Sequence, residues 1–284
     1  MTFVTVSTVK GAPGATTVAL LLAQQFAGLL PNARTCILAD CDVAGGDLGP
    51  LLGLPGVPGL ASLALAARHG LTLELLIAHT QPSPHSPGLR ALLGVAGPEQ
   101  GGALNWIWKQ LGDTLADPAV LAVADLGRVG ADDRHSELGG RAVTNLLVTC
   151  DGVAALLHAK AACESAERSG RPLSIVVAGR RRWPLSHIAE ATSAEVLGAV
   201  RFDPSDLSSV LSTGRRGHLR IGRRSDRRGA LRCDVEALAR KVADRIGSAE
   251  LAAPAVPDPS SLQLWAGGRV TARRIGRRQA GSLA

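Results

Sequence analysis

Several features that would assign a function at once are missing from this sequence. Its five cysteines form no CxxC pair and no metal-site spacing, so we expect small buried side chains in a reducing cytoplasm. No segment matches a nucleophile elbow or a zinc signature. No run of about 18 apolar residues predicts a membrane span, and Met1 leads directly into a predicted strand, so no N-terminal signal is expected. Aromatic residues are scarce, but 46% of the 284 residues are hydrophobic, which is enough for a full core.

The charge is distributed unevenly along the chain. Residues 1–213 carry 15 Lys and Arg against 18 Asp and Glu, whereas residues 214–284 carry 16 against 6. A basic C-terminal portion favours an anionic partner, which could be DNA, an anionic membrane surface or an acidic protein. Eight arginines within 18 residues make the densest cluster: Arg215, Arg216, Arg220, Arg223, Arg224, Arg227, Arg228 and Arg232. The alternative is that this cluster is only a solvated basic loop in an arginine-rich protein.

Short apolar segments alternate with helical patterns along residues 1–247. Strands are expected at 1–7, 35–39, 120–124, 144–149 and 173–178, with a further one at 92–96. Helices are expected at 18–30, 62–68, 73–79, 104–115, 153–169, 185–196 and 234–246. This alternation predicts a doubly wound α/β domain over residues 1–247, with a mostly parallel sheet and helices on both faces. Residues 248–284, which are rich in proline and then basic, are predicted to form a flexible tail.

One segment between the first strand and the first helix carries the clearest chemistry. It reads Lys10-Gly11-Ala12-Pro13-Gly14-Ala15-Thr16-Thr17. Backbone N–H groups and the dipole of the following helix favour phosphate at such a turn. Against the P-loop pattern G-x-x-x-x-G-K-[ST], Val9 replaces the first glycine and Ala15 replaces the lysine, while Thr16 keeps the hydroxyl that binds Mg²⁺. Losing one charge-assisted contact costs about 1.5–3 kcal/mol, so weakened nucleotide binding is expected.

Acidic residues follow two of the predicted strands. Asp40 and Asp42 come directly after the strand at 35–39, and Asp47 follows a few residues later. The alternative for Asp40 and Asp47 is that their side chains only cap turns. Asp125 ends the apolar run 120–124, the place of a Walker-B carboxylate that holds Mg²⁺. Because the carboxyl ends of parallel strands meet at one edge of a sheet, these carboxylates are expected beside the phosphate turn.

The order of these motifs resembles the MinD/ParA class of deviant-Walker P-loop ATPases, which belong to the SIMIBI type of P-loop NTPase. It resembles most the CpaE/TadZ-like pilus-assembly branch, in which a small residue often replaces the P-loop lysine. The resemblance covers residues 1–247 and implies binding of ATP and Mg²⁺, the metal being held by Thr16 and Asp125. It also implies that Lys10 reaches across a homodimer to the partner's nucleotide and that Asp42 orients the attacking water. The loop matching residues 199–203, with Asp203, is implied to border the adenine.

Three functional hypotheses follow from these residues. The leading one is a cytoplasmic MinD/ParA-like positioning or assembly factor that binds ATP weakly, acts through nucleotide-linked dimerisation and is at most a slow ATPase. It is expected to serve a pilus or secretion machine and to lie peripheral to membrane or nucleoid. Retention of DNA by the arginine cluster would instead favour a nonspecific DNA-binding partition ATPase. A turn blocked by Val9 or Pro13 would favour a scaffold that needs no nucleotide.

Overall fold

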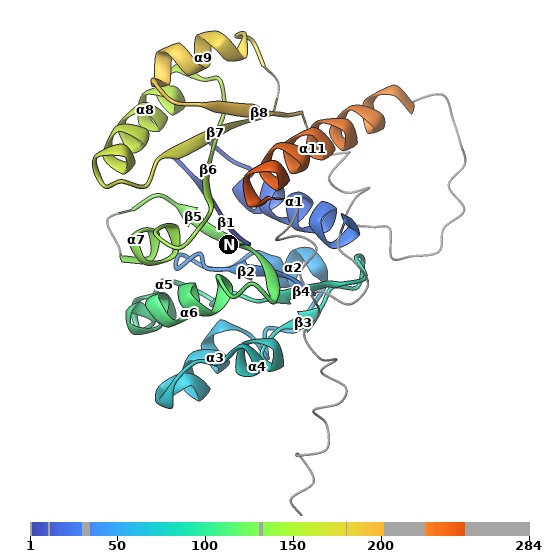
Figure 1. The fold of residues 1–284 in the computed structure, drawn as a ribbon, viewed down its shortest axis with the longest axis vertical. Helices are drawn as coiled ribbons and strands as arrows, with labels where there is room; N and C mark the ends of the chain where they lie inside the picture. Colours follow the sequence, from blue (N-terminus) through green and yellow to red (C-terminus); the bar gives the residue numbers. More distant parts are fainter. Residues whose placement is uncertain are drawn as a thin grey trace, which may run out of the picture.

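Eight strands build a single sheet in the computed structural model, which describes residues 2–10, 12–29, 35–130, 133–179, 181–201 and 225–247. The strands are β1 (Phe3–Thr8), β2 (Thr35–Asp40), β3 (Gln81–Pro82), β4 (Leu89–Leu92), β5 (Val120–Arg128), β6 (Thr144–Thr149), β7 (Leu173–Ala178) and β8 (Val196–Val200). Their order across the sheet is β3-β4-β2-β5-β1-β6-β7-β8 (Figure 1). All neighbours pair in parallel except β3, which pairs antiparallel with β4 at one edge. The predicted mostly parallel, doubly wound sheet is confirmed.

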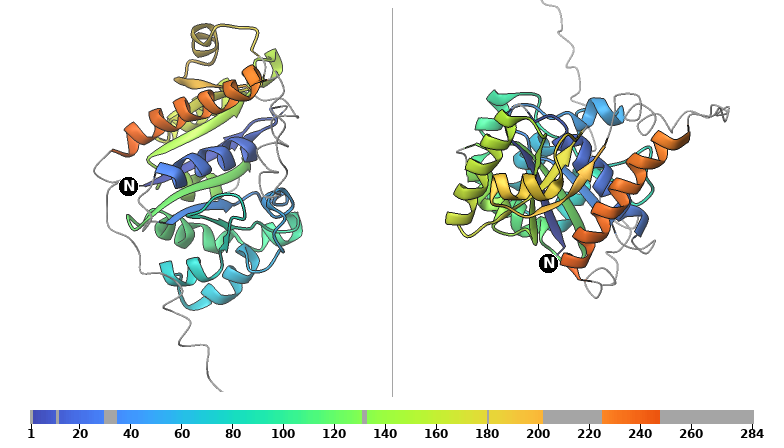
Figure 2. Two further views of the ribbon diagram at one scale, coloured as in Figure 1. Left: turned by 90° about the vertical axis from the view of Figure 1, so that its right-hand side faces the viewer. Right: turned by 90° about the horizontal axis from the view of Figure 1, so that it is seen from above.

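Helices cover both faces of this sheet. The longer ones are α1 (Ala15–Leu29), α6 (Trp108–Leu115), α8 (Val153–Arg168), α9 (Leu185–Thr192) and α11 (Ser225–Ile246). The shorter ones are α2 (Leu48–Leu52), α3 (Leu60–Ala66), α4 (Leu73–Ala78), α5 (Pro98–Gly102) and α7 (Asp133–Gly139), with 3-10 turns at Ala67–His69 and Asn105–Ile107. Helices α1 and α11 lie side by side over one face (Figure 2), and α3, α4, α6, α7, α8 and α9 lie on the other.

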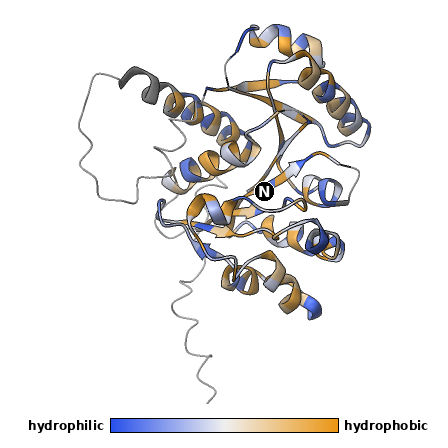
Figure 3. Ribbon diagram, turned by 180° about the vertical axis from the view of Figure 1, so that it is seen from behind, coloured by the Kyte–Doolittle hydropathy of each residue, from blue (hydrophilic) through white to orange (hydrophobic). Residues whose placement is uncertain are grey.

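Alternation along each strand explains how both faces are covered. In β1, Val4 and Val6 join α1 and α11 in one apolar cluster, while Phe3 packs into a cluster on the opposite face. The strands are predominantly hydrophobic, as expected where helices bury both faces of a parallel sheet (Figure 3). Strand β1 lies at the centre, between β5 and β6, so the chain winds away from it in both directions. Ligands bind at the carboxyl ends of the strands near such a reversal.

Some predicted boundaries are wrong. The strand expected at 92–96 lies at Leu89–Leu92, because the chain turns out of the sheet before Gly94. The helix expected at 185–196 ends at Thr192, since Ser193 adopts a left-handed conformation and Val196 begins β8. Helix α1 begins at Ala15 rather than Val18, and α11 begins at Ser225 rather than Asp234. The tail predicted at 248–284 lies outside the described residues.

Candidate functional site

The turn between β1 and α1 is held by hydrogen bonds within itself and to the neighbouring strand. The N–H of Ala12 donates to the carbonyl of Val9 at 3.2 Å, and the Thr8 hydroxyl lies within hydrogen-bond distance of the carbonyls of Ala12 and Val148. Gly14 has φ of 109°, a conformation that a side chain would strain. Helix α1 begins at the next residue, so its first N–H groups lack acceptors within the helix and face the end of the turn.

The residues that depart from the P-loop pattern have different surroundings. Val9 is buried and packs into an apolar cluster with residues of β6, β7, α8 and α9, so its side chain faces the core. Ala15 is also buried, in the cluster beneath α1. Lys10 and Pro13 are exposed. The position of the missing lysine is therefore filled by a methyl group, and the remaining cation of the turn faces solvent.

Asp125 lies beside this turn, near the carboxyl end of β5. Its Oδ1 accepts the Gly127 N–H at 3.0 Å. Its Oδ2 is buried and accepts no hydrogen bond from the part of the chain that the structure describes. Burial raises the pKa of this carboxyl, and the nearby hydroxyl of Thr16 and the Gly127 N–H partly offset that rise. A buried carboxylate oxygen without a donor is a group that a cation would satisfy.

Asp40 is the neighbour of Asp125 in the register of β2 and β5. Its carboxylate accepts the Leu48 N–H at 3.1 Å and the Asp42 N–H at 3.3 Å, so it holds the following turn. It fits tightly between Gly46 and Gly94, where an added Cβ would lie within 2.5 and 2.8 Å of the Asp40 side chain, respectively. Burial, followed by the charge of Asp125, raises the pKa of Asp40 to about 7.

Asp42 is held by an arginine that the sequence did not bring to attention. The Asp42 carboxylate accepts the Ala44 N–H at 2.8 Å and lies 3.7 Å from Nη1 of Arg134, on α7. The Arg134 side chain is buried and donates to the Cys41 carbonyl at 2.8 Å. It therefore joins the Asp40–Asp42 turn to the region after β5. No spacing relative to Asp42 or Asp125 marks Arg134 in the sequence, because the contact is long-range.

The other predicted site residues are only partly placed. Asp47 stands at the N-cap position of α2 but makes no capping hydrogen bond with its side chain. Gly11, Asp203, Arg215, Arg216, Arg220, Arg223 and Arg224 lie outside the described residues. Arg227, Arg228 and Arg232 fall within helix α11. Before Asp203, Arg201 makes a forked ion pair with Asp234 of α11, with Nε–Oδ2 and Nη2–Oδ1 distances of 2.8 and 3.0 Å.

This chain resembles known proteins in its fold but not detectably in its sequence. No protein-family model matches the chain, and no curated protein does. Solved structures do match. The septum site-determining protein MinD of Pyrococcus horikoshii, solved with Mg-ADP, aligns with a TM-score of 0.67 at 17% identity, over 88% of this chain and 99% of that one. A ParA family ATPase from Chlorobium tepidum aligns with a TM-score of 0.65 at 18% identity, over 84% and 98%.

This chain has the MinD/ParA fold. A third match, in the MinC:MinD complex of Aquifex aeolicus, has a TM-score of 0.62 at 17% identity over 85% of this chain and 96% of that one. In the MinD/ParA fold of this chain, Thr16, Asp40, Asp42 and Asp125 meet at the carboxyl edge of the sheet, around β1. Within the described residues, no helix is long and apolar enough to cross a bilayer.

Proposed function

We propose that this protein is a MinD/ParA-like positioning or assembly factor that binds ATP and Mg²⁺ weakly and acts through nucleotide-linked dimerisation. The fold supports this proposal, since it is shared with a MinD that was solved with Mg-ADP. The observation that carries it is the buried Asp125 carboxyl group, which interacts with the Thr16 hydroxyl at the start of α1 and whose Oδ2 has no hydrogen-bond donor among the described residues. Asp40 adds a second carboxylate within electrostatic reach.

The residues present fit a magnesium ion better than they fit a tightly held triphosphate. Thr16 and Asp125 would hold Mg²⁺, directly or through water, since hydroxyl and carboxylate oxygens suit this cation. The bound ion would neutralise phosphate charge. Backbone N–H groups at the start of α1 remain for the phosphates, but Ala15 offers no charge where the P-loop lysine would stand. The protein is therefore proposed to be at most a slow ATPase.

Dimerisation is proposed from the exposure of Lys10. Its side chain faces solvent at the rim of the turn, where a second copy could place its phosphates. A nucleotide held between two copies would receive from the partner the positive charge that Ala15 does not supply. Under this proposal ATP, with Asp42 nearby to orient water, links two copies through Lys10.

A protein partner is proposed to dock on α8 and α9, which leave apolar side chains uncovered. Val153, Leu157 and Trp183 are 71%, 64% and 49% exposed around a hollow of about 330 Å³. Exposed apolar clusters of this kind mark protein contacts. The partner is proposed to belong to a pilus or secretion machine. An alternative function, nonspecific DNA binding, is favoured by the excess of ten positive charges in residues 214–284.

The test is isothermal titration of the full chain with ATP and ADP, with and without Mg²⁺. Ala15→Lys should tighten ATP binding about tenfold or more, because it restores one charge-assisted contact worth about 1.5–3 kcal/mol. Asp125→Asn should weaken binding only in the presence of Mg²⁺, since it removes the anionic ligand of the metal and keeps the side-chain shape. Circular dichroism of each variant controls for folding, because Ala15 and Asp125 are buried.

Light scattering in the same samples tests the dimer. ATP should raise the mass of the wild-type chain, and Lys10→Ala should abolish that rise without changing the mass of the free protein. If neither the wild-type chain nor Ala15→Lys binds ATP at millimolar concentration, the scaffold reading replaces this proposal. DNA binding would be recognised by a gel shift whose log–log salt slope is near −0.9 per phosphate contact.

A further inference from the structure

A polar seam interrupts the core on the face of the sheet that carries α7 and α8. Strand β1 presents Thr5 and Ser7 on this face, and both are buried. The Thr5 hydroxyl donates to Oδ1 of Asn145 on β6 at 2.6 Å. Apolar clusters lie on either side, one around β2 and β5 and the other around β6 and β7. The polar seam, defined as Thr5, Ser7, Asn145 and Arg171, therefore runs over the central strand.

Two cavities open along this seam. One, of about 280 Å³, lies between α7 and α8 over β1, and the other, of about 670 Å³, lies at the amino ends of β6 and β7. They share Gly139, Asn145, Arg171 and Leu173 in their walls. Small-molecule sites in proteins measure about 300–1,000 Å³. The larger cavity lies at the sheet edge opposite the β1–α1 turn, so it is separate from the nucleotide site proposed above.

The end of α7 keeps the cavities open. Gly139 and Gly140 have no side chains, and the Arg171 stem lies about 4 Å from where their Cβ atoms would be. A Cβ on Gly139 would lie 3.0 Å from Oδ1 of Asn145, and one on Gly140 would lie 2.9 Å from the Ser136 carbonyl. A side chain at either position would therefore crowd Asn145 or the Ser136 carbonyl, while the Arg171 stem lies at ordinary van der Waals distance and lines both cavities.

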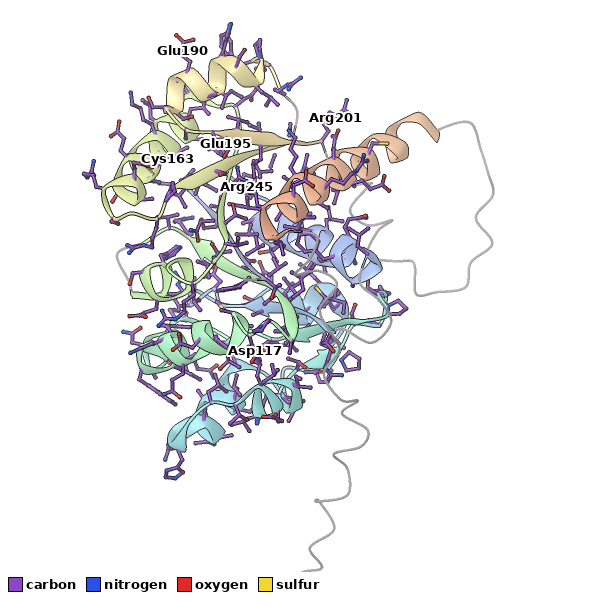
Figure 4. The ribbon with its side chains drawn as sticks, viewed as in Figure 1. Asp117, Cys163, Glu190, Glu195, Arg201 and Arg245 are labelled. Atoms are coloured by element: carbon purple, nitrogen blue, oxygen red, sulfur yellow. The ribbon has the colours of Figure 1, made fainter. Side chains whose placement is uncertain are left out.

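The charges of the larger cavity are unequally paired, and two of the charged residues in its wall, Glu195 and Arg245, are labelled in Figure 4. Arg245, at the end of α11, forms an ion pair with Glu195 and donates to Thr144 and Ser174 at 2.9 Å each. In contrast, the guanidinium of Arg171 makes no hydrogen bond or ion pair with any residue that the structure describes. Glu164 and Glu167 also line the cavity, but from exposed positions on α8 where water screens them. A half-buried arginine without a partner favours an oxyanion.

We propose that the polar seam binds a small molecule that carries a phosphate or carboxylate group, with Arg171 as its charged anchor. The hydroxyl group of Ser165 lines the smaller cavity and offers a further donor. The polar walls suit a hydrophilic ligand rather than an apolar one. This site requires neither nucleotide nor a second copy of the chain, so it stands independently of the proposed function.

Cys163 provides a local reporter for the test. Its side chain lines the larger cavity and is 7% exposed. The full-length protein is treated with iodoacetamide at pH 9, and modification of the peptide that contains Cys163 is followed by mass spectrometry. Inorganic phosphate is titrated against sodium chloride at constant ionic strength, and acetate is titrated in parallel. Saturable protection by either anion is expected, and the more effective anion identifies the preferred group.

Two substitutions decide whether Arg171 is the anchor. Arg171→Gln should raise the concentration for half-protection about tenfold or more, as expected for the loss of one charge-assisted contact. Arg168→Gln removes an equal charge from an exposed position on α8 outside both cavities and should leave protection unchanged. Arg171→Lys keeps the charge but loses the two parallel N–H donors of the guanidinium, so its concentration for half-protection should be intermediate. This variant replaces Arg171→Gln in the test if the glutamine variant misfolds.

The opposite results are equally clear. The proposal is overturned if neither anion slows modification of Cys163 in the wild-type protein. It is also overturned if Arg171→Gln and Arg171→Lys are protected as well as the wild-type chain, since the anion would then be bound elsewhere. Equal weakening by Arg168→Gln would indicate general charge attraction and no built site.

Discussion

The two faces of the sheet are covered in different ways. Under α1 and α11, one apolar cluster runs from β4 to β8 without interruption. On the opposite face the apolar residues divide into two clusters, and the polar seam lies between them over β1. Both patterns come from the same strand, because Val4 and Val6 face one side while Thr5 and Ser7 face the other.

This difference assigns separate tasks to the two faces. Continuous apolar burial contributes roughly 25 cal/mol per Å² of area removed from water, and the α1–α11 face buries its apolar side chains in one unbroken cluster. A polar strip at the centre of a sheet contributes less, since its hydroxyl and amide groups must give up water and find partners. Its cavities remain available for a ligand. The comparison therefore predicts large energetic effects on the continuous face and smaller, coupled effects along the seam.

The largest effect is expected for Phe26→Ala on the continuous face. Phe26 is 1% exposed on α1, and its removal should lower the free energy of unfolding by about 3–5 kcal/mol through lost burial and the cavity left behind. Urea denaturation followed by circular dichroism measures the change. Leu29→Ala in the same helix is the matched control, because Leu29 is 60% exposed and should change stability by about 0.5 kcal/mol or less. Similar losses for both variants would contradict the burial assignment of α1.

A smaller effect is expected for Thr5→Val in the seam. The variant keeps the side-chain shape but removes the donor to Oδ1 of Asn145, and a buried acceptor left unpaired costs about 1–3 kcal/mol. Asn145→Leu should also destabilise the fold, since it removes the donor to the Gly139 carbonyl at 3.2 Å. Because the double variant removes both members of the pair, its loss should be smaller than the sum of the single losses by about 0.5–3 kcal/mol.

Urea denaturation of the wild-type chain, the two single variants and the double variant gives this coupling energy directly. Val6→Ala, on the same strand but facing the continuous cluster, provides the comparison. Its loss should add to that of Thr5→Val without coupling, because the two side chains lie on opposite faces. Additive losses for Thr5→Val and Asn145→Leu would show that the seam does not behave as a hydrogen-bonded unit.

The sequence predicts the central part of the fold well because periodicity is strong there. The apolar runs at 144–149 and 173–178 match β6 and β7, and the run at 120–124 forms the first part of β5, which continues to Arg128. Prediction failed where local signals compete with tertiary pairing. Residues 193–196 read as the end of a helix, but Val196 pairs with Ile175 of β7 and is drawn into the sheet. The run at 92–96 is apolar because Leu92 and Val95 are buried in the cluster that includes α3 and Leu93 is buried in the cluster on the opposite face, although the strand ends at Leu92.

The residues of the candidate site also differ in whether a local sequence pattern marks them. Thr16, Asp42 and Asp125 could be found from the sequence, because each follows a strand or turn at a recognisable place. Arg134 could not, because it reaches Asp42 across 92 positions of chain and no local pattern encodes that contact. The seam was also missed. Thr5 and Ser7 look like ordinary alternation in a strand, and only the approach of Asn145 and Arg171 from distant segments reveals a shared cavity.

The smallest expected effect is a difference in chemical reactivity between two cysteines, measured without any substitution. Cys36 lies in the continuous cluster and is fully buried, whereas Cys163 lines the larger cavity of the seam. Burial raises the pKa of the Cys163 thiol to about 11. Only the thiolate reacts with iodoacetamide, so the rate at Cys163 should rise about tenfold per pH unit between pH 8 and pH 10. The rate should level off only above the raised pKa. Cys36 should stay unmodified until the protein unfolds, and the same experiment in urea should make both thiols react. If Cys36 in the folded protein were modified as fast as Cys163, the proposed difference between a closed face and a face with open cavities would be contradicted.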